Sequence, residues 1–133
     1  MKIMLLACLL VAGLNHISAQ TAADSIRKAH ANTPVPDTQT GIASYYHSKF
    51  EGRPTASGEL YDQAKMTAAH NKLPLGTMIK VTNLRNKRSV VVKVNDRLHH
   101  RNTRIVDLSR AAAASLGFIS RGLARVKVEV LKD

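Results

Sequence analysis

The sequence predicts a mainly β fold, a small closed barrel of about six short strands with one short helix. Two valine-rich segments, residues 90–97 and 124–131, place apolar residues at every second position, as half-buried strands do. Other β-branched segments follow at short intervals and are separated by Gly, Pro and Asn. Past the N-terminal region, only residues 110–116 have the composition of a helix. Many short strands with one helix favour a closed barrel.

Length and composition indicate one domain with an aliphatic core. The chain has 133 residues, of which 44% are hydrophobic, enough for one packed core but not for two domains. Aromatic residues make up only 4% and Trp is absent, so Val, Leu, Ile and Ala must fill that core.

The N-terminus resembles a secretory signal peptide, which we expect to cover residues 1–19. Residues 3–14 are apolar, and cleavage is expected after Ala19. This run is too short to span a bilayer. A buried N-terminal helix is one alternative. Acylation of Cys8, the only cysteine, is another, although this residue lies early for a lipoprotein signal.

The net charge of +11 at pH 7 suits a polyanionic partner: nucleic acid, an anionic membrane or an acidic cell-wall polymer. The signal peptide and the lack of a recognisable nucleic-acid-binding motif lead us to expect no nucleic-acid partner. We expect a monomer exported to the cell envelope, in the periplasm, that could associate with a membrane through its N-terminus. An outer-membrane lipoprotein and a secreted protein are the alternatives.

The segment before the domain, residues 20–40, is small, polar and interrupted by prolines, so we expect a flexible linker there. The folded domain is expected to cover residues 41–133. It opens with a β-rich segment at residues 41–47, and a loop rich in Gly and Pro follows at residues 48–58.

A β-hairpin is predicted in the middle of the domain. Its strands, residues 77–83 and 88–95, are rich in β-branched residues and flank a tight polar turn. A short segment at residues 65–69 and a turn at residues 73–76 precede it.

The last third of the domain contains a short strand, the helix and the last strand. We predict the first strand at residues 104–108 and the last one at residues 124–131. Between them, Ser109 is expected to cap a helix at residues 110–116, and Gly117 is expected to end it.

Asp96 is the strongest candidate for a reacting residue. Every second residue of a strand lies on the same face, so Asp96 continues the apolar face of Val90, Val92 and Val94. A charge on such a face is costly unless the strand runs out of the core into a cleft. An Asp that closes the turn at the strand end is the structural alternative.

A second group of polar residues lies within residues 55–70. Glu59 follows a glycine in a loop of small residues, where a substrate could approach the backbone. Asp62 could equally hold this loop through an Asx turn. His70 could bind a carboxylate or a ligand, or it could be a satisfied buried histidine. We interpret Asp107 as structural, because it shortly precedes the predicted helix.

We expect no metal and no cofactor. The candidates for a metal site are histidines together with Asp96: His47, His70, His99 and His100. Adjacent histidines on an extended segment point in opposite directions, so His99 and His100 cannot both ligate one ion readily.

The motifs of the domain, in order, resemble those of the rare lipoprotein A (RlpA) family. They are GIASYYHSKFEGRPTASGELYD, MTAAHNKLPLGT, VTNL, VVVKVNDR and RIVDLS, and they cover residues 41 to about 130. The resemblance implies the family fold, a six-stranded double-psi β-barrel that expansins and the membrane-bound lytic transglycosylase A share. It also implies an endolytic peptidoglycan lytic transglycosylase of cell-wall remodelling. Such enzymes cleave MurNAc–GlcNAc bonds without water and leave 1,6-anhydro-MurNAc ends.

The same resemblance implies four catalytic residues: Asp96 of VNDR, Glu59 and Asp62 of TASGELYD, and His70 of TAAH. Asp96 is expected to protonate the leaving oxygen and then to accept the proton of the attacking C6 hydroxyl. Four neighbouring residues are expected to bind the glycan: Tyr46, Thr55, Ser57 and Arg97.

Two departures from the family pattern keep an alternative open. The family usually has Gly-Pro-Phe after VNDR, where this chain has Leu98, His99 and His100, so the loop beside the cleft differs. Many members also carry a C-terminal SPOR domain for septal targeting, which we do not expect here. The alternative is a non-catalytic, expansin-like module that binds glycan or loosens the wall.

Overall fold

The computed structural model describes residues 34–99 and 101–132. The predicted signal peptide, Cys8 and most of the predicted linker lie outside these residues. The domain, Val35–Asp133, is one compact unit. Within the described residues, no helix is long and apolar enough to cross a membrane.

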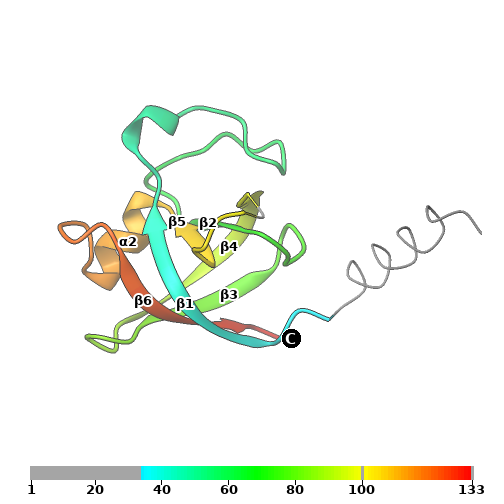
Figure 1. Ribbon diagram of the computed structural model, residues 1–133. Coiled ribbons are helices and arrows are strands. Elements are labelled where there is room, and N and C mark those ends of the chain that lie inside the picture. Colours follow the sequence, from blue (N-terminus) through cyan, green and yellow to red (C-terminus); the bar gives the residue numbers. More distant parts are fainter. Residues whose placement is uncertain (1–33, 100, 133) are drawn as a thin grey trace, which may run out of the picture. The chain divides into compact units, whose positions relative to one another are not determined.

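Six strands close into a barrel in the order β1-β5-β2-β4-β3-β6, with β6 paired to β1 (Figure 1). The strands are β1 (Thr38–Tyr45), β2 (Thr67–His70), β3 (Met78–Asn83), β4 (Ser89–Arg97), β5 (Val106–Leu108) and β6 (Ala124–Val130). The β1–β5 and β2–β4 pairs are parallel, and the other four are antiparallel. A 3-10 helix η1 (Ser48–Phe50) and a helix α2 (Arg110–Leu116) complete the fold. The predicted six-stranded barrel with one short helix is confirmed.

The core is aliphatic, as the composition predicts. Alternate residues of the hairpin strands point inward, and Ile79, Val81, Val92 and Val94 are fully buried. Helix α2 closes one side of the barrel with small and apolar residues, and Phe118 just after it is the buried phenylalanine of this core.

The caps of α2 follow the prediction. The Ser109 hydroxyl accepts a hydrogen bond from the amide of Ala112 at 3.3 Å, which satisfies one of the free N–H groups of the first turn. Gly117 ends the helix with φ 78°, a left-handed conformation that glycine adopts without strain.

The start of the domain differs from the prediction. Strand β1 begins at Thr38, inside the segment predicted as linker, because Thr38 and Thr40 pair with Glu129 and Lys127 of β6. The polar side chains of Thr38 and Thr40 give no strand pattern in the sequence. Their pairing depends on β6, a strand far away in the chain, rather than on local pattern.

The face of Asp96 also differs from the prediction. In the parallel β2–β4 pair, Ala68 lies opposite Val94 while Ala69 lies opposite Asp96, so Asn95 is an extra residue in β4. Such a bulge shifts the alternation by one. Asn95 is consequently buried, and Asp96 leaves the apolar face.

The long connection from β1 to β2, residues 46–66, extends from the barrel end at which β4 finishes (Figure 1). It is held there by a hydrogen bond of 3.0 Å from the amide of Ser57 to the carbonyl of Asn95. This connection and the end of β4 together frame the candidate site.

Candidate active site

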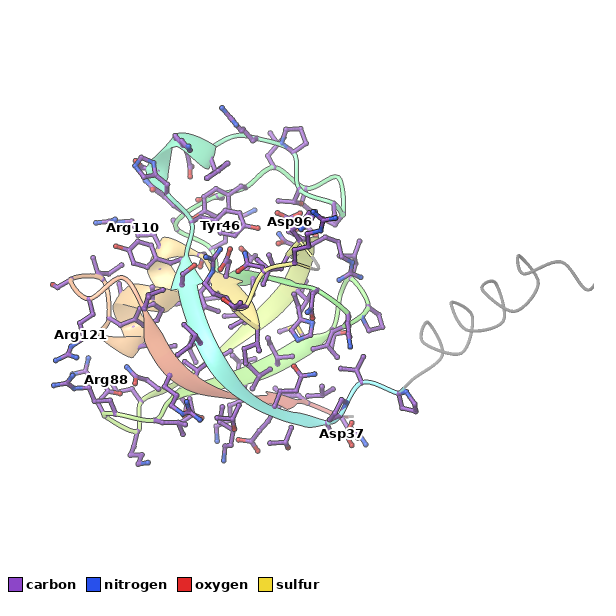
Figure 2. All side chains as sticks on the ribbon, viewed as in Figure 1. Asp37, Tyr46, Arg88, Asp96, Arg110 and Arg121 are labelled. Atoms are coloured by element: carbon purple, nitrogen blue, oxygen red, sulfur yellow. The ribbon has the colours of Figure 1, made fainter. Side chains whose placement is uncertain are left out.

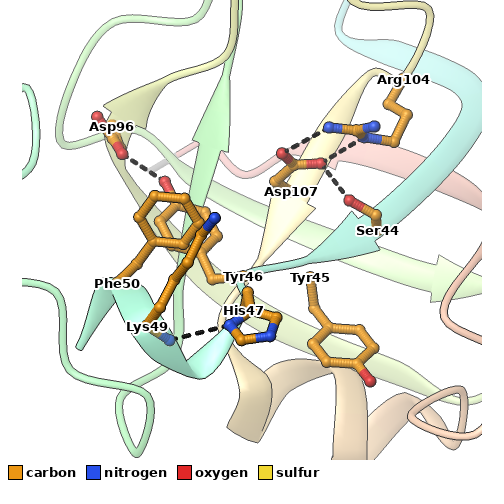
Figure 3. A pocket seen from close by; sticks show the side chains of 9 residues that line it. All are labelled: Ser44, Tyr45, Tyr46, His47, Lys49, Phe50, Asp96, Arg104 and Asp107. Carbon is orange, nitrogen blue, oxygen red and sulfur yellow. Dashed lines mark hydrogen bonds and ion pairs between the residues drawn. The ribbon is translucent and has the colours of Figure 1, made fainter.

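A cavity of about 420 Å³ opens where the end of β1 meets the ends of β4 and β5 (Figure 3). Nine residues line it: Ser44, Tyr45, Tyr46, His47, Lys49, Phe50, Asp96, Arg104 and Asp107. It therefore contains two carboxylates, two cations and an aromatic wall, which is a lining suited to a polar ring ligand.

Asp96 lies at this cavity, half-buried, and its two oxygens have different partners. Oδ1 accepts hydrogen bonds from the amides of Ala56 and Arg97, both at 2.9 Å. Oδ2 accepts a hydrogen bond from the Tyr46 hydroxyl. The backbone thus fixes one oxygen, and the other, which accepts from Tyr46, has a second lone pair that can take a proton.

Tyr46 is held as a donor to Asp96. Its ring stacks on Tyr61 with centroids 4.5 Å apart, and it meets the edge of Phe50 at 5.9 Å. Burial raises the pKa of Tyr46, and the hydrogen bond to Asp96 and the charge of that carboxylate raise it further. The hydroxyl therefore keeps its proton. Both ring contacts are made within the protein, so Tyr46 is placed to orient Asp96, and its binding of the glycan stays a prediction.

Thr55 and Ser57 build the loop that covers Asp96. The Thr55 hydroxyl donates to the carbonyl of Glu59 at 2.7 Å, and the Ser57 hydroxyl accepts from the amide of Glu59 at 3.2 Å. Thr55 is buried and Ser57 is exposed. These bonds hold the turn that aims the Ala56 amide at Asp96.

Glu59 lies on the same loop, but its carboxylate pairs with Lys93 at 2.8 Å. The hydrogen bond from Lys93 lowers the pKa of Glu59, so this exposed group stays ionised near neutral pH. It can accept a hydrogen bond from a sugar hydroxyl, and it is a poor proton donor.

Asp62 and Arg97 bind the protein's own backbone. Asp62 Oδ1 accepts from the amide of Ala64 at 2.9 Å, which is the Asx turn that the sequence left open as an alternative. Arg97 donates through Nη1 to the carbonyls of Leu73 at 2.6 Å and of His70 at 3.1 Å. Both residues are therefore placed to hold the loops around the site.

His70 is 0% exposed and does not line the cavity. Its Nδ1 accepts from the amides of Lys72 and Leu73, both at 3.0 Å, and its Nε2 lies 3.1 Å from the side-chain oxygen of Gln39. These contacts agree with the buried, satisfied histidine that was the alternative, and a catalytic role of His70 stays a prediction.

The cavity also contains a polar cluster of three residues that the sequence did not predict. Asp107 accepts from the Ser44 hydroxyl at 2.6 Å and from Arg104 through Nε at 2.8 Å and Nη2 at 3.1 Å (Figure 3). The pairing raises the pKa of Arg104. The sequence predicts a structural role for Asp107, because this residue shortly precedes the helix. Its place in the cavity depends instead on the pairing of β5 with β1.

Among the described residues, no group of three or more His, Cys, Asp or Glu side chains is arranged to hold a metal ion. What the cavity offers is a fixed carboxylate, a tyrosine hydroxyl and an Arg–Asp pair. Such a set can donate and accept protons and can bind the hydroxyl or carbonyl groups of a polar ligand.

The sequence model of the lytic transglycolase family matches residues 38–128, which include strands β1 to β5, both helices and most of β6. A Haemophilus influenzae protein named endolytic peptidoglycan transglycosylase RlpA is 52% identical over 91 residues, which are 68% of this chain and 32% of that protein. A Pseudomonas aeruginosa protein of the same name is 55% identical over 89 residues, 67% of this chain and 26% of that protein. The chain thus matches about a third or less of each of these relatives.

Solved structures share the barrel. The Streptomyces papain inhibitor superposes with a TM-score of 0.59 at 23% identity, over 76% of this chain and 100% of that one. The apo expansin of Clavibacter michiganensis gives a TM-score of 0.58 at 25% identity, over 72% of this chain and 51% of that one. Proteins of different function therefore share this fold, and the argument for function depends on the site.

Proposed function

This chain belongs to the RlpA family of lytic transglycolases, with a double-psi β-barrel, and from this premise we propose that it is an endolytic peptidoglycan transglycosylase. The proposed substrate is the glycan strand of peptidoglycan, cleaved between MurNAc and GlcNAc to leave 1,6-anhydro-MurNAc ends. The expected signal peptide supports an envelope location, in the periplasm, where this polymer lies.

The observation that carries the proposal is the placement of Asp96. Its carboxyl is at the cavity, is oriented by two backbone amides and Tyr46, and has a lone pair left on Oδ2 that can take a proton. A glycan that crosses the cavity would meet this oxygen. Glu59 is less suited to donate a proton, because Lys93 keeps it ionised.

The proposed reaction needs one acid/base and no water. Protonated Asp96 transfers its proton to the GlcNAc oxygen as the bond between that oxygen and the anomeric carbon of MurNAc breaks. The C6 hydroxyl of the same MurNAc then attacks the anomeric carbon, and its proton passes to Asp96. One carbon–oxygen bond is broken and one is formed, and Asp96 ends protonated as it began.

Mass spectrometry of the soluble products tests this function. The full chain, incubated with intact and with amidase-treated peptidoglycan, is expected to release products that end in 1,6-anhydro-MurNAc and that are one water lighter than hydrolysis products. Products with reducing ends would show a hydrolase instead. Binding to peptidoglycan without any soluble product would favour the expansin-like alternative, a glycan-binding or wall-loosening module.

A Tyr46→Phe variant is expected to release these products roughly 10- to 100-fold more slowly, with little change in melting temperature. It keeps the ring contacts with Tyr61 and Phe50 and removes only the hydroxyl that orients Asp96. Initial rates of product release, together with thermal unfolding, measure both effects.

Tyr45→Phe is the matched control. The Tyr45 hydroxyl donates to the carbonyl of Ile119 at 2.8 Å and does not reach Asp96, so this variant also loses one hydrogen bond. It should retain the wild-type rate. Equal rates for the two variants would show that Tyr46 does not orient the acid.

A further inference from the structure

Five exposed cations gather where two loops meet: Arg85, Lys87, Arg88, Arg121 and Arg125, here named the basic patch. The first three come from the β3–β4 turn, and the other two lie on either side of the turn into β6. Figure 2 shows the Arg88 and Arg121 side chains near each other and on the other side of the barrel from Asp96.

The two loops are fixed to each other. The side-chain amides of Asn83 and Asn86 both donate to the carbonyl of Leu116 at 2.9 Å, and the amide of Leu84 donates to the carbonyl of Arg125 at 3.0 Å. Arg88 lies against the end of α2, where a Cβ on Gly117 would be only 3.1 Å from its Nη1. The patch is therefore preformed.

Among the described residues, none of the ion pairs involves a cation of the basic patch. Residues 84–88 and 117–127 contain no Asp or Glu. Within the described part of the chain, the ion pairs use other cations: Lys93, Arg104, Lys127 and Lys132. Five neighbouring cations repel one another, so an external anionic surface would be bound favourably.

An exposed leucine lies among these cations. Leu123 is 54% exposed, and its position between Arg121 and Arg125 places an apolar side chain at the tip of the turn after Gly122. An apolar side chain flanked by arginines suits the boundary between lipid headgroups and acyl chains. A soluble polyanion such as nucleic acid would gain nothing from it.

We infer that the basic patch with Leu123 binds the phosphate headgroups of an anionic lipid bilayer. The arginines would pair with the phosphates, and Leu123 would enter the interface. This surface is separate from the proposed catalytic cavity and does not depend on its activity.

Strand β4 separates the basic patch from the cavity. It runs from Ser89, beside the patch, to Asp96 at the cavity, which is roughly 23 Å at about 3.3 Å per residue. The acidic residues Glu51, Glu59, Asp62 and Asp107 lie with Asp96 at the cavity or on the connection beside it. A chain bound through the patch would therefore hold its cavity away from the lipid, facing the glycan.

Vesicle sedimentation with the full chain tests the inference. The triple variant Arg85→Gln, Arg121→Gln, Arg125→Gln is expected to bind phosphatidylglycerol-containing vesicles about 100-fold more weakly than wild type, at about 1 kcal/mol per arginine. The difference should largely disappear in about 0.5 M salt and with pure phosphatidylcholine vesicles. Glycan cleavage in solution should be unchanged.

The matched control Lys65→Gln, Lys72→Gln, Lys80→Gln removes the same charge from other exposed positions and should bind like wild type. Leu123→Ser should weaken vesicle binding roughly tenfold and leave binding of duplex DNA unchanged. Equal vesicle affinities for the two triple variants would overturn the inference, because net charge alone would then explain binding. So would an unchanged affinity of Leu123→Ser together with tight DNA binding, which would identify a general polyanion site.

Discussion

An Asp96→Asn variant is expected to lose release of anhydro-muropeptides by at least about 1,000-fold, because it removes the group that donates and accepts the proton. The fold should remain. The Asn oxygen can still accept from the amides of Ala56 and Arg97, and its NH₂ group can donate to the Tyr46 oxygen. Product release followed by mass spectrometry, with thermal unfolding alongside, separates loss of chemistry from loss of structure.

Asp37→Asn is the matched control for Asp96→Asn. Asp37 is exposed and pairs with Lys132 at 2.6 Å, away from the cavity, so the same change of charge there should leave the rate unaltered. An Asp96→Asn variant as active as wild type would mean that another group is the acid. Loss of activity with loss of the thermal transition would point to folding instead.

The free energy of unfolding is expected to fall by about 3 kcal/mol as the pH is lowered from 7 to 4, through His70 alone. Burial, together with the charges of Arg97 and Lys72, lowers the pKa of His70 from 6.5 to about 4. The hydrogen bonds agree, since Nδ1 already accepts from the amides of Lys72 and Leu73 and has no place for a proton.

The direction of this pH effect follows from the protonation of His70 in the folded and in the unfolded chain. The unfolded chain takes up a proton at His70 near pH 6.5, whereas the folded chain resists it until about pH 4. Lowering the pH within this window stabilises the unfolded state. The contribution is complete above pH 6.5, is lost on the way to pH 4 and changes no further below it.

Urea unfolding at about pH 7.5 and pH 4.5 measures this effect in three proteins. His70→Asn keeps an acceptor near the position of Nδ1 but cannot titrate, so over this interval its stability should change by about 2.5 kcal/mol less than that of wild type. His47→Asn, at an exposed position, should keep the wild-type dependence. A pH dependence of His70→Asn that equals that of wild type would show that His70 does not carry the effect.

The periodicity of the chain predicted most of its elements, because local rules decide them, but it left β2 as a short segment and placed the start of β1 in the linker. Alternating valines predicted β4 and β6, the β-branched hairpin predicted β3, and Ser109 with Gly117 predicted both ends of α2. The resemblance to the RlpA family added the double-psi topology, which periodicity cannot specify, and the family match agrees with it.

Tertiary pairing decided the details that matter for the site. The extra residue Asn95 turns Asp96 off the apolar face, and it is visible only against β2. The parallel pairing of β1 with β5 brings Ser44 to Asp107, although 63 residues separate them. Neither position has a local pattern that marks it, since partner strands far apart in the chain create both.

The sequence by itself determined a six-stranded barrel with an aliphatic core, one capped helix and Asp96 at the end of a strand. Only the tertiary structure decided which polar residues meet in the cavity. Of those predicted, Tyr46 and Asp96 line it, Glu59 pairs with Lys93, and His70 is fully buried. The reason is physical: residue type and period fix what one segment can form, whereas a side chain's partners are fixed by the strands that close the barrel around it.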